Sequence, residues 1–171
     1  SLMALVETLP DLEEVRCYEL LPEVTGRFIE EMGALFPALT FTACDSAPAA
    51  AHEADVVVTA IPIVVDPSPE LDAGALKPGG LAVSLDYDSA WTGAAMKECD
   101  KYCSDDVGQM LATKEHGVYF KDIPSTVYAD LGELAAGLKP GREHDDERIF
   151  SMNMGIAVDD MVTARVLYER A

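Results

Sequence analysis

A chain of 171 residues, of which 49% are apolar, is long enough for one domain with a hydrophobic core and too short for two ordinary domains. That composition excludes a disordered chain. The sequence holds neither a membrane-length apolar run nor a basic-then-apolar leader, so we expect a soluble, cytoplasmic protein. With 31 acidic against 12 basic residues, the net charge of -19 disfavours nucleic acid and anionic membranes as partners.

The four cysteines and three histidines show no spacing typical of a disulfide framework or a zinc site. We therefore expect a reducing compartment and no structural metal. Cys17 and Cys44 lie in or at the end of apolar, strand-like runs, where a free thiol usually acts as a small core hydrophobe.

The first third of the chain alternates helix and strand patterns. An apolar run over residues 2–9, stopped by Pro10, predicts the end of a helix, and residues 14–18 predict a strand. Pro22 suits the first turn of a second helix, and Gly33 stands where a glycine would end it. Residues 39–43 then predict the second strand.

Further strands are expected in the middle of the chain. Residues 55–60 are nearly all apolar and β-branched, which predicts a third strand buried on both faces. The turn sequence at residues 77–80 precedes a fourth strand at residues 81–85, and residues 101–104 are a weaker strand candidate.

The last third continues the alternation. Two helices are expected to flank residues 118–125, the second over residues 127–136, and residues 148–152 predict a strand. Strands that alternate with helices predict one α/β domain over residues 1–171, with a doubly wound, mostly parallel sheet and flanking helices. Gly155 begins the final helix, whose apolar positions are Ile156, Val158, Met161, Val162, Val166 and Leu167.

Ligands of doubly wound sheets bind beyond the carboxyl ends of the strands, so the residues that follow each strand are the first site candidates. Glu19 follows the first strand, where an acidic residue typically binds the adenosine ribose; an ordinary solvated glutamate is an equal alternative. Leu20, where an arginine would help to hold a 2′-phosphate, favours NAD over NADP. Thr59, Ala60 and Ile61 follow the third strand, where a backbone approaches a cofactor.

The most pointed feature is the sequence Asp86, Tyr87, Asp88 after the fourth strand. Two carboxylates two positions apart on an extended segment project to the same side and can perturb one another's pKa. Such a pair suits a general base or the binding of an ammonium group. A polar turn after a strand is the alternative, and composition alone favours it.

Several segments in sequential order carry a recognisable pattern. The closing segments at residues 155–160 and 167–171 belong to it, as do residues 54–60 followed by residues 76–79. The most specific part pairs Leu-Gly-Glu-Leu at residues 131–134 with Lys-Pro-Gly-Arg at residues 139–142. Together these segments span essentially the whole chain and resemble the nucleotide-binding domain of the ornithine cyclodeaminase and mu-crystallin family.

The resemblance implies a Rossmann-like domain and a chemistry. Members of that family use NAD(H) or NADP(H) to oxidise an amino acid to an imine or to reduce an imine, and cyclodeaminases convert ornithine to proline and ammonia. Asp88 stands at the position of an aspartate that acts on the α-amino group of the substrate, with Asp86 and Tyr87 beside it in the substrate pocket. The implied cofactor-binding residues are Glu19, Thr59, Ala60, Ile61, Asn153 and Gly155.

Two departures from the family pattern accompany the match. Residues 86–88 read Asp-Tyr-Asp where the family usually has Gly-Ala-Asp, so the substrate pocket gains a charge and a ring. The chain also lacks the first strand, its glycine-rich turn and the family's N-terminal domain for substrate binding and dimerisation. We therefore predict an N-terminally truncated domain that binds NAD weakly or not at all and is inactive alone. We also predict self-association through the exposed sheet edge or through the surface that the N-terminal domain would otherwise cover.

Two functional hypotheses follow. The first is a fragment of an NAD-dependent, ornithine cyclodeaminase-like enzyme that acts on an amino acid as a lyase or an oxidoreductase. A ketimine reductase or alanine dehydrogenase activity stays open within this hypothesis. The alternative is a truncated, non-enzymatic relative that serves as a binding or oligomerisation module.

Overall fold

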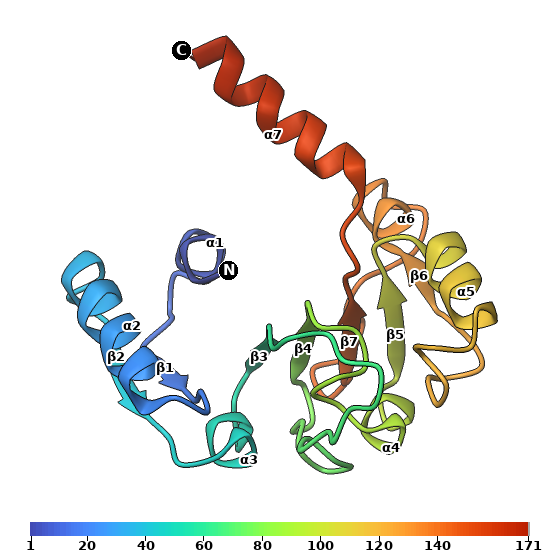
Figure 1. The fold of residues 1–171 in the computed structure, drawn as a ribbon. Helices are drawn as coiled ribbons and strands as arrows, with labels where there is room; N and C mark the ends of the chain where they lie inside the picture. The colour runs from blue at the N-terminus through green and yellow to red at the C-terminus, as the bar shows by residue number, and fades with distance from the viewer. Residues whose placement is uncertain (171) are drawn as a thin grey trace. The chain divides into compact units, whose positions relative to one another are not determined.

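The computed structural model describes residues 1–170, and the chain forms two compact units, Ser1–Ala54 and Asp55–Ala171 (Figure 1). Each unit is described by itself. All strand pairs in both units are parallel, and helices connect most of the strands. The sequence-based prediction of an α/β, Rossmann-like architecture with a mostly parallel sheet is therefore confirmed.

The first unit contains a two-stranded sheet with three helices. Pro22 occupies the first turn of the second helix, as predicted, because its missing N–H is not needed there. Gly33 was expected to end this helix, but the helix continues to Leu35 because the glycine keeps a right-handed backbone. The elements are α1 (Leu2–Thr8), β1 (Glu14–Cys17), α2 (Pro22–Leu35), β2 (Thr40–Ala43) and α3 (Ala47–Ala51), and β1 pairs with β2.

Packing in the first unit is modest. Phe28 of α2 meets Phe41 of β2 edge to face, with 6.5 Å between ring centroids. Helix α3 was not predicted; its N-cap is Ser46, whose hydroxyl accepts a hydrogen bond from the third residue along. Cys17 and Cys44 are free, half-buried thiols rather than members of a closed core.

The second unit contains a five-stranded sheet in the order β3-β4-β7-β5-β6. The carboxyl ends of these strands lie at one edge, because all of them run in the same direction. The elements are β3 (Val56–Thr59), β4 (Leu81–Ser84), α4 (Gly93–Lys97), β5 (Lys101–Ser104), α5 (Val107–Glu115), β6 (Ala129–Asp130), α6 (Leu131–Ala135), β7 (Ile149–Met152) and α7 (Ala157–Arg170).

Burial in this sheet differs from the sequence-based expectation. Strand β3 was predicted to be buried on both faces, but it is the end strand of the five and only Val57 is buried. The weaker candidate β5 lies inside the sheet instead, and all four of its residues are buried. Position in the sheet, rather than apolar composition, decides which strand is enclosed.

The core of the second unit surrounds Phe150 of β7, which has no exposed surface. Its ring stacks on Tyr102 of β5 and meets Trp91 edge to face, with centroids 5.4 Å apart in both pairs. The turn at residues 77–80 is built as predicted. Gly79 has a φ of 78°, and a Cβ there would collide with the carbonyl oxygen of Asp145, so glycine is required.

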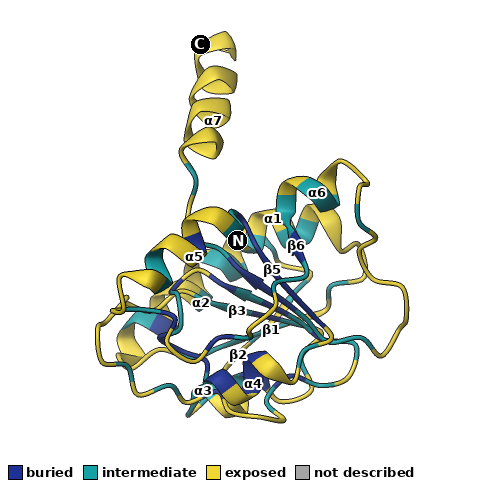
Figure 2. Cartoon of the chain, turned by 90° about the vertical axis from the view of Figure 1, so that its right-hand side faces the viewer, coloured by how far each residue is buried: buried dark blue, intermediate teal, exposed yellow. Residues whose placement is uncertain are grey.

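Helix α7 begins later than predicted and is exposed along its length (Figure 2). Gly155 has a φ of 87°, which a right-handed helix cannot accommodate, so the helix starts two residues further on. Its apolar side chains, Val158, Met161, Val162, Val166 and Leu167, are all exposed. None of the helices within residues 1–170 is long and apolar enough to cross a membrane.

Candidate functional site

The carboxyl edge of the five-stranded sheet gathers most of the predicted site residues. Thr59 ends β3 and residues 60–61 follow it, while residues 85–88 follow β4, residue 105 follows β5 and residues 153–155 follow β7. Parallel strands bring their carboxyl ends to one edge, which is where α/β proteins bind ligands. The segment order β3-β4-β7 therefore places the proposed substrate segment between the two proposed cofactor segments.

Asp88 is half-buried and lies in a turn after β4. Its Oδ2 accepts a hydrogen bond of 2.9 Å from the backbone N–H of Phe120, a residue with no exposed surface. One carboxylate oxygen is thus held by the protein, whereas no hydrogen bond within the described residues occupies Oδ1. A carboxylate anchored on one oxygen can accept a proton or bind an ammonium group with the other.

Asp86 occupies a different setting. It has no exposed surface, and its carboxylate accepts hydrogen bonds from the hydroxyl of Thr59 (2.9 Å), the hydroxyl of Ser84 (2.7 Å) and the N–H of Ile61 (3.1 Å). These partners all belong to the ends of β3 and β4 and the loop after β3. The predicted place of Asp86 in the substrate pocket is untested, and its carboxylate is enclosed by these partners with no exposed surface to offer a substrate.

The segment that carries both aspartates is bent rather than extended. Tyr87 has a φ of 58°, in the left-handed region that a bulky residue rarely adopts. This backbone turn breaks the alternation of side chains, so Asp86 and Asp88 accept their hydrogen bonds from different segments. The expected extended pair of carboxylates is therefore wrong. The alternative interpretation from sequence, a polar turn after a strand, describes the local backbone.

The residues that follow β3 have small or apolar side chains and a fixed backbone. The Thr59 hydroxyl accepts a hydrogen bond of 3.2 Å from the indole N–H of Trp91 and donates one to Asp86. Ala60 and Ile61 are exposed. Their predicted contact with a cofactor remains untested, but the loop that they form is accessible and its backbone is fastened.

Asn153 and Gly155 follow β7 at the same edge. The backbone N–H of Asn153 donates to the carbonyl oxygen of Ser84 at 2.9 Å, which ties this loop to β4. The N–H of Gly155 donates to the buried carboxylate of Asp105 at 2.7 Å. An open hollow of about 440 Å³ lies here, lined by Val83, Leu85, Asp105, Leu131, Asn153, Met154, Gly155 and Asp159.

Asp105 is a residue of this edge that sequence analysis missed. Its Oδ2 also accepts the N–H of Met154 at 2.8 Å, and its Oδ1 accepts the N–H of Asp106 at 2.9 Å. The available signal was an acidic residue directly after a strand, as at Asp86. The sequence predicted a strand at Lys101–Ser104 only weakly, so it did not indicate that Asp105 follows a strand at this edge.

Glu19 lies in the first unit, in the short loop between β1 and α2, and is exposed. Its Oε1 accepts a hydrogen bond of 2.9 Å from the N–H of Leu20. The side chain is therefore accessible to a ribose hydroxyl, and the predicted role stays a prediction.

Comparison with known proteins decides the family. The profile of the Ornithine cyclodeaminase/mu-crystallin family matches residues 1–171. The chain belongs to this family. A relative from Staphylococcus aureus, named N-((2S)-2-amino-2-carboxyethyl)-L-glutamate dehydrogenase, is 28% identical over all of this chain and 51% of its own length.

Solved structures show the same fold. Thermococcus litoralis Delta(1)-pyrroline-2-carboxylate reductase, in complex with NADH and L-proline, has a TM-score of 0.79 at 22% identity, over 99% of this chain and 54% of the other. An archaeal alanine dehydrogenase dimer with bound NAD has a TM-score of 0.77 at 24% identity, over 98% and 52%. The chain thus spans about half the length of each of these three proteins.

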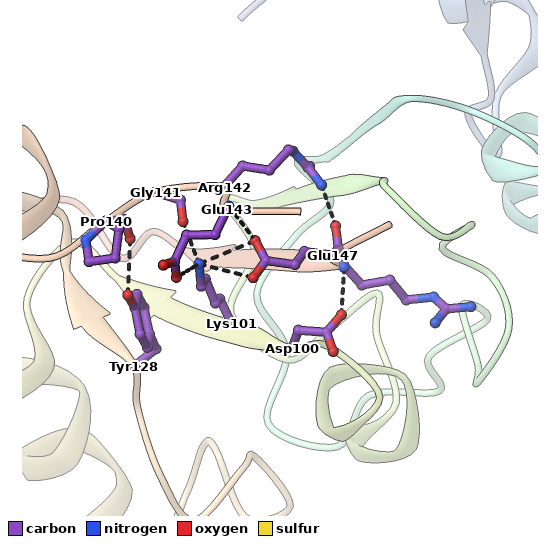
Figure 3. Close-up of polar contacts among 9 residues, drawn as sticks. Asp100, Lys101, Tyr128, Pro140, Gly141, Arg142, Glu143 and Glu147 are labelled. Atoms are coloured by element: carbon purple, nitrogen blue, oxygen red, sulfur yellow. Dashed lines mark hydrogen bonds and ion pairs between the residues drawn. The ribbon is translucent and has the colours of Figure 1, made fainter. Parts of the chain in front are cut away.

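The opposite, amino edge of the sheet, where the strands begin, is enclosed by side chains around Lys101. Lys101 begins β5 with a nearly buried side chain, and its ammonium group pairs with Glu143 at 2.8 Å and Glu147 at 3.1 Å (Figure 3). The same group lies 5.2 Å from the centre of the Tyr128 ring. The carbonyl oxygen of Gly141 accepts a further hydrogen bond. Every direction of the ammonium group is occupied by the protein, which indicates a structural role.

The pKa shifts at this edge agree with stable ion pairing. Burial alone would lower the pKa of Lys101, but its hydrogen bonds and charge interactions with Glu143 and Glu147 outweigh burial and raise it. The hydrogen bond from the N–H of Glu143 lowers the pKa of Glu147, and the interaction with Lys101 lowers it further. A hollow of about 580 Å³ lies nearby, around Cys99, Tyr102 and residues 123–128. It is larger than the hollow at the carboxyl edge, but none of the predicted site residues lines it.

Proposed function

We propose that this chain is the cofactor-binding part of an NAD-dependent enzyme that interconverts an amino acid and its imine. The observation that carries the proposal is the gathering of Asp88, the residue 59–61 loop and the residue 153–155 loop at one edge of a parallel sheet. The family membership supports it, as do the names of relatives that are dehydrogenases or reductases of amino acids and cyclic imines.

Asp88 has the proton-transfer role in this proposal. Oxidation of an amine to an imine removes a hydride from the α-carbon and a proton from nitrogen, and the unoccupied Oδ1 of Asp88 accepts that proton. In the reductive direction the same oxygen returns it. The Phe120 N–H holds the other oxygen and orients the carboxylate.

The residues present fit the nicotinamide end of NAD. Ile61 and Ala60 offer an accessible, small-residue loop on one side, and Asn153 and Gly155 line the hollow on the other. Glu19 is the proposed acceptor for the ribose hydroxyls. Bound NAD supplies hydride acceptance and donation, while the chain supplies position and a proton acceptor.

Turnover assays of the natural protein that carries this chain test the proposal. We expect loss of NADH absorbance on addition of a cyclic imine such as Delta(1)-pyrroline-2-carboxylate, and a fall in kcat of about 100-fold or more in Asp88→Asn. Identification of the products separates a reductase from a cyclodeaminase, which releases ammonia without net loss of NADH. Unchanged turnover in Asp88→Asn would remove Asp88 from the mechanism. The 171-residue chain alone is expected to show no turnover and only weak NADH binding.

A second candidate function is assembly with another copy of this chain. The exposed apolar side chains of α7 favour it, and so does its charge pattern, with Asp159 and Asp160 in the first turn and Arg170 in the last; Arg165 is already paired with Glu169 at 2.8 Å. An antiparallel pair of such helices would bring opposite charges together. Light scattering at high protein concentration is the test, and a monodisperse monomer would contradict self-association.

A further inference from the structure

A buried carboxylate lies at the carboxyl edge without a charged partner. Asp86 has no exposed surface, and its hydrogen-bond partners among the described residues are two hydroxyls and one backbone N–H. Charge-assisted hydrogen bonds of this kind are about twice as strong as neutral ones, and a buried carboxylate that lost them would be costly. The Ser84 hydroxyl also lies 2.7 Å from the carbonyl oxygen of Tyr87, so its single hydrogen is shared between two acceptors. The donors from Thr59 and Ile61 stabilise the Asp86 carboxylate, and Asp86 in turn fixes their positions.

The donors come from two separate segments. Thr59 and Ile61 belong to the end of β3 and the loop after it, whereas Ser84 ends β4. Trp91, whose side chain is 1% exposed, donates its indole N–H to the Thr59 hydroxyl and extends the network into the core. One carboxylate thus connects the proposed cofactor loop to the strand that precedes Asp88.

A second contact fixes the other side of the turn. Tyr87 adopts a φ of 58° and its ring lies 4.9 Å from the Phe120 ring, while the N–H of Phe120 donates to Asp88. The turn at residues 86–88 is therefore held at Asp86 by the end of β3 and at Asp88 by residue 120. A strained residue between two anchors keeps one conformation only as long as both anchors hold.

From this arrangement we infer that Asp86 is a positioning residue, which sets the Asp88 carboxylate relative to the loop at residues 59–61. Its carboxylate does not touch a substrate. It holds the loop at residues 59–61 and the turn at residues 86–88 in one fixed geometry. The inference deepens the proposed function and rests on it, because the proposed function assigns cofactor binding to residues 59–61 and proton transfer to Asp88. The geometry itself can be tested without a substrate.

Nuclear magnetic resonance of the 171-residue chain tests it with Asp86→Ala and Asp86→Asn. In Asp86→Ala we expect amide exchange at Ile61 to accelerate by about tenfold or more, because its hydrogen-bond acceptor is gone. We also expect the Trp91 indole, the Phe120 amide and the Asp88 carboxyl resonances to shift. In Asp86→Asn the effect should be partly rescued, since a carboxamide oxygen still accepts from Ile61 while the two hydroxyls rotate to accept from its amino group.

A matched control and a milder variant guard against a simple loss of folding. Asp72 is an exposed aspartate that also accepts a threonine hydroxyl and a backbone N–H, from Thr92 and Ala73, so Asp72→Ala should leave the Ile61 exchange rate and the Phe120 and Asp88 resonances unchanged. Thr59→Val removes one donor to Asp86 together with the acceptor of the Trp91 indole N–H, so it should shift the Trp91 indole resonance strongly and the Phe120 and Asp88 resonances less than Asp86→Ala does. Unchanged Phe120 and Asp88 resonances in a folded Asp86→Ala variant would overturn the inference.

Addition of NADH separates this inference from the proposed function. The proposed function predicts that NADH shifts the amides of residues 59–61 in the natural protein that carries this chain. If NADH shifts none of them while Asp86→Ala still displaces Asp88, the proposed function fails and the positioning geometry stands. If NADH shifts them and Asp86→Ala leaves the Asp88 resonance in place, the proposed function stands and the positioning role of Asp86 fails.

Discussion

The two edges of the five-stranded sheet bury charge in different ways. At the carboxyl edge, Asp86 and Asp105 accept hydrogen bonds from hydroxyls and backbone N–H groups of neighbouring loops, without an ion pair. At the amino edge, Lys101 is enclosed by two glutamates, a backbone carbonyl and the Tyr128 ring (Figure 3). The first arrangement fixes loops beside an open hollow, and the second closes the end of a strand.

This difference separates scaffold from site within one sheet. An ammonium group with every direction occupied by protein has nothing left to offer a ligand. A carboxylate that orders loop backbones leaves the outer faces of those loops free, which suits a binding edge. Buried charge by itself therefore does not mark the functional site; the nature of its partners does.

The comparison assumes that both edges of the sheet share one hydrophobic core. Phe150→Ala would disrupt that core and should have the largest effect. Phe150 has no exposed surface and contacts Trp91 and Tyr102, so we expect a loss of about 3–5 kcal/mol in the free energy of unfolding. Urea unfolding followed by Trp91 fluorescence measures it. The control Leu111→Ala changes a side chain that is 45% exposed and should cost less than about 1 kcal/mol. A small effect of Phe150→Ala would mean that the edges do not share this core.

Asp105→Ala sharpens the account of the carboxyl edge. The change leaves the N–H groups of Met154 and Gly155 without their acceptor, so we expect about 1–3 kcal/mol of destabilisation. Hydrogen exchange should accelerate at residues 154 and 155 and stay unchanged at residues 141–147. Equal acceleration at both edges would contradict the separation between them.

Lys101→Met addresses the amino edge. Removal of the ammonium group leaves Glu147 without its cation, so we expect the thermal unfolding midpoint to fall by several degrees. Lys101→Arg, which keeps the charge, should retain most of the stability. Resonances of residues 59–61, 88 and 153–155 should not move in either variant. Displacement of those resonances would show that the closed edge also shapes the site.

The pH dependence of stability gives the smallest expected effect. The Glu147 carboxylate has a pKa below the value of 4.5 for an unperturbed glutamate, because the Glu143 N–H and then Lys101 favour its charged form. Its contribution is therefore complete above about pH 4.5 and is lost as the pH falls through the lower, folded-state pKa. Glu147→Gln should flatten the fall of the unfolding midpoint in that acidic range. Glu115→Gln, at an exposed site, serves as the control.

Sequence patterns predicted the strands and the family well, because β-branched runs and turn glycines act locally. They failed where the outcome depends on the rest of the sheet. Composition could not show that Val56–Thr59 is an end strand while Lys101–Ser104 lies inside. Spacing alone suggested that Asp86 and Asp88 face the same way, whereas the left-handed backbone of Tyr87 turns them to different partners.

Titration of the chain with NADH, observed through its backbone amide resonances, tests the central claim most directly. The account predicts weak but saturable shifts at the carboxyl edge, at residues 59–61, 88 and 153–155, and at Glu19. Residues 101 and 141–147 at the closed edge should stay unmoved. Shifts confined to the larger hollow, around residues 123–126 and Tyr128, would contradict the assignment of the carboxyl edge as the cofactor site.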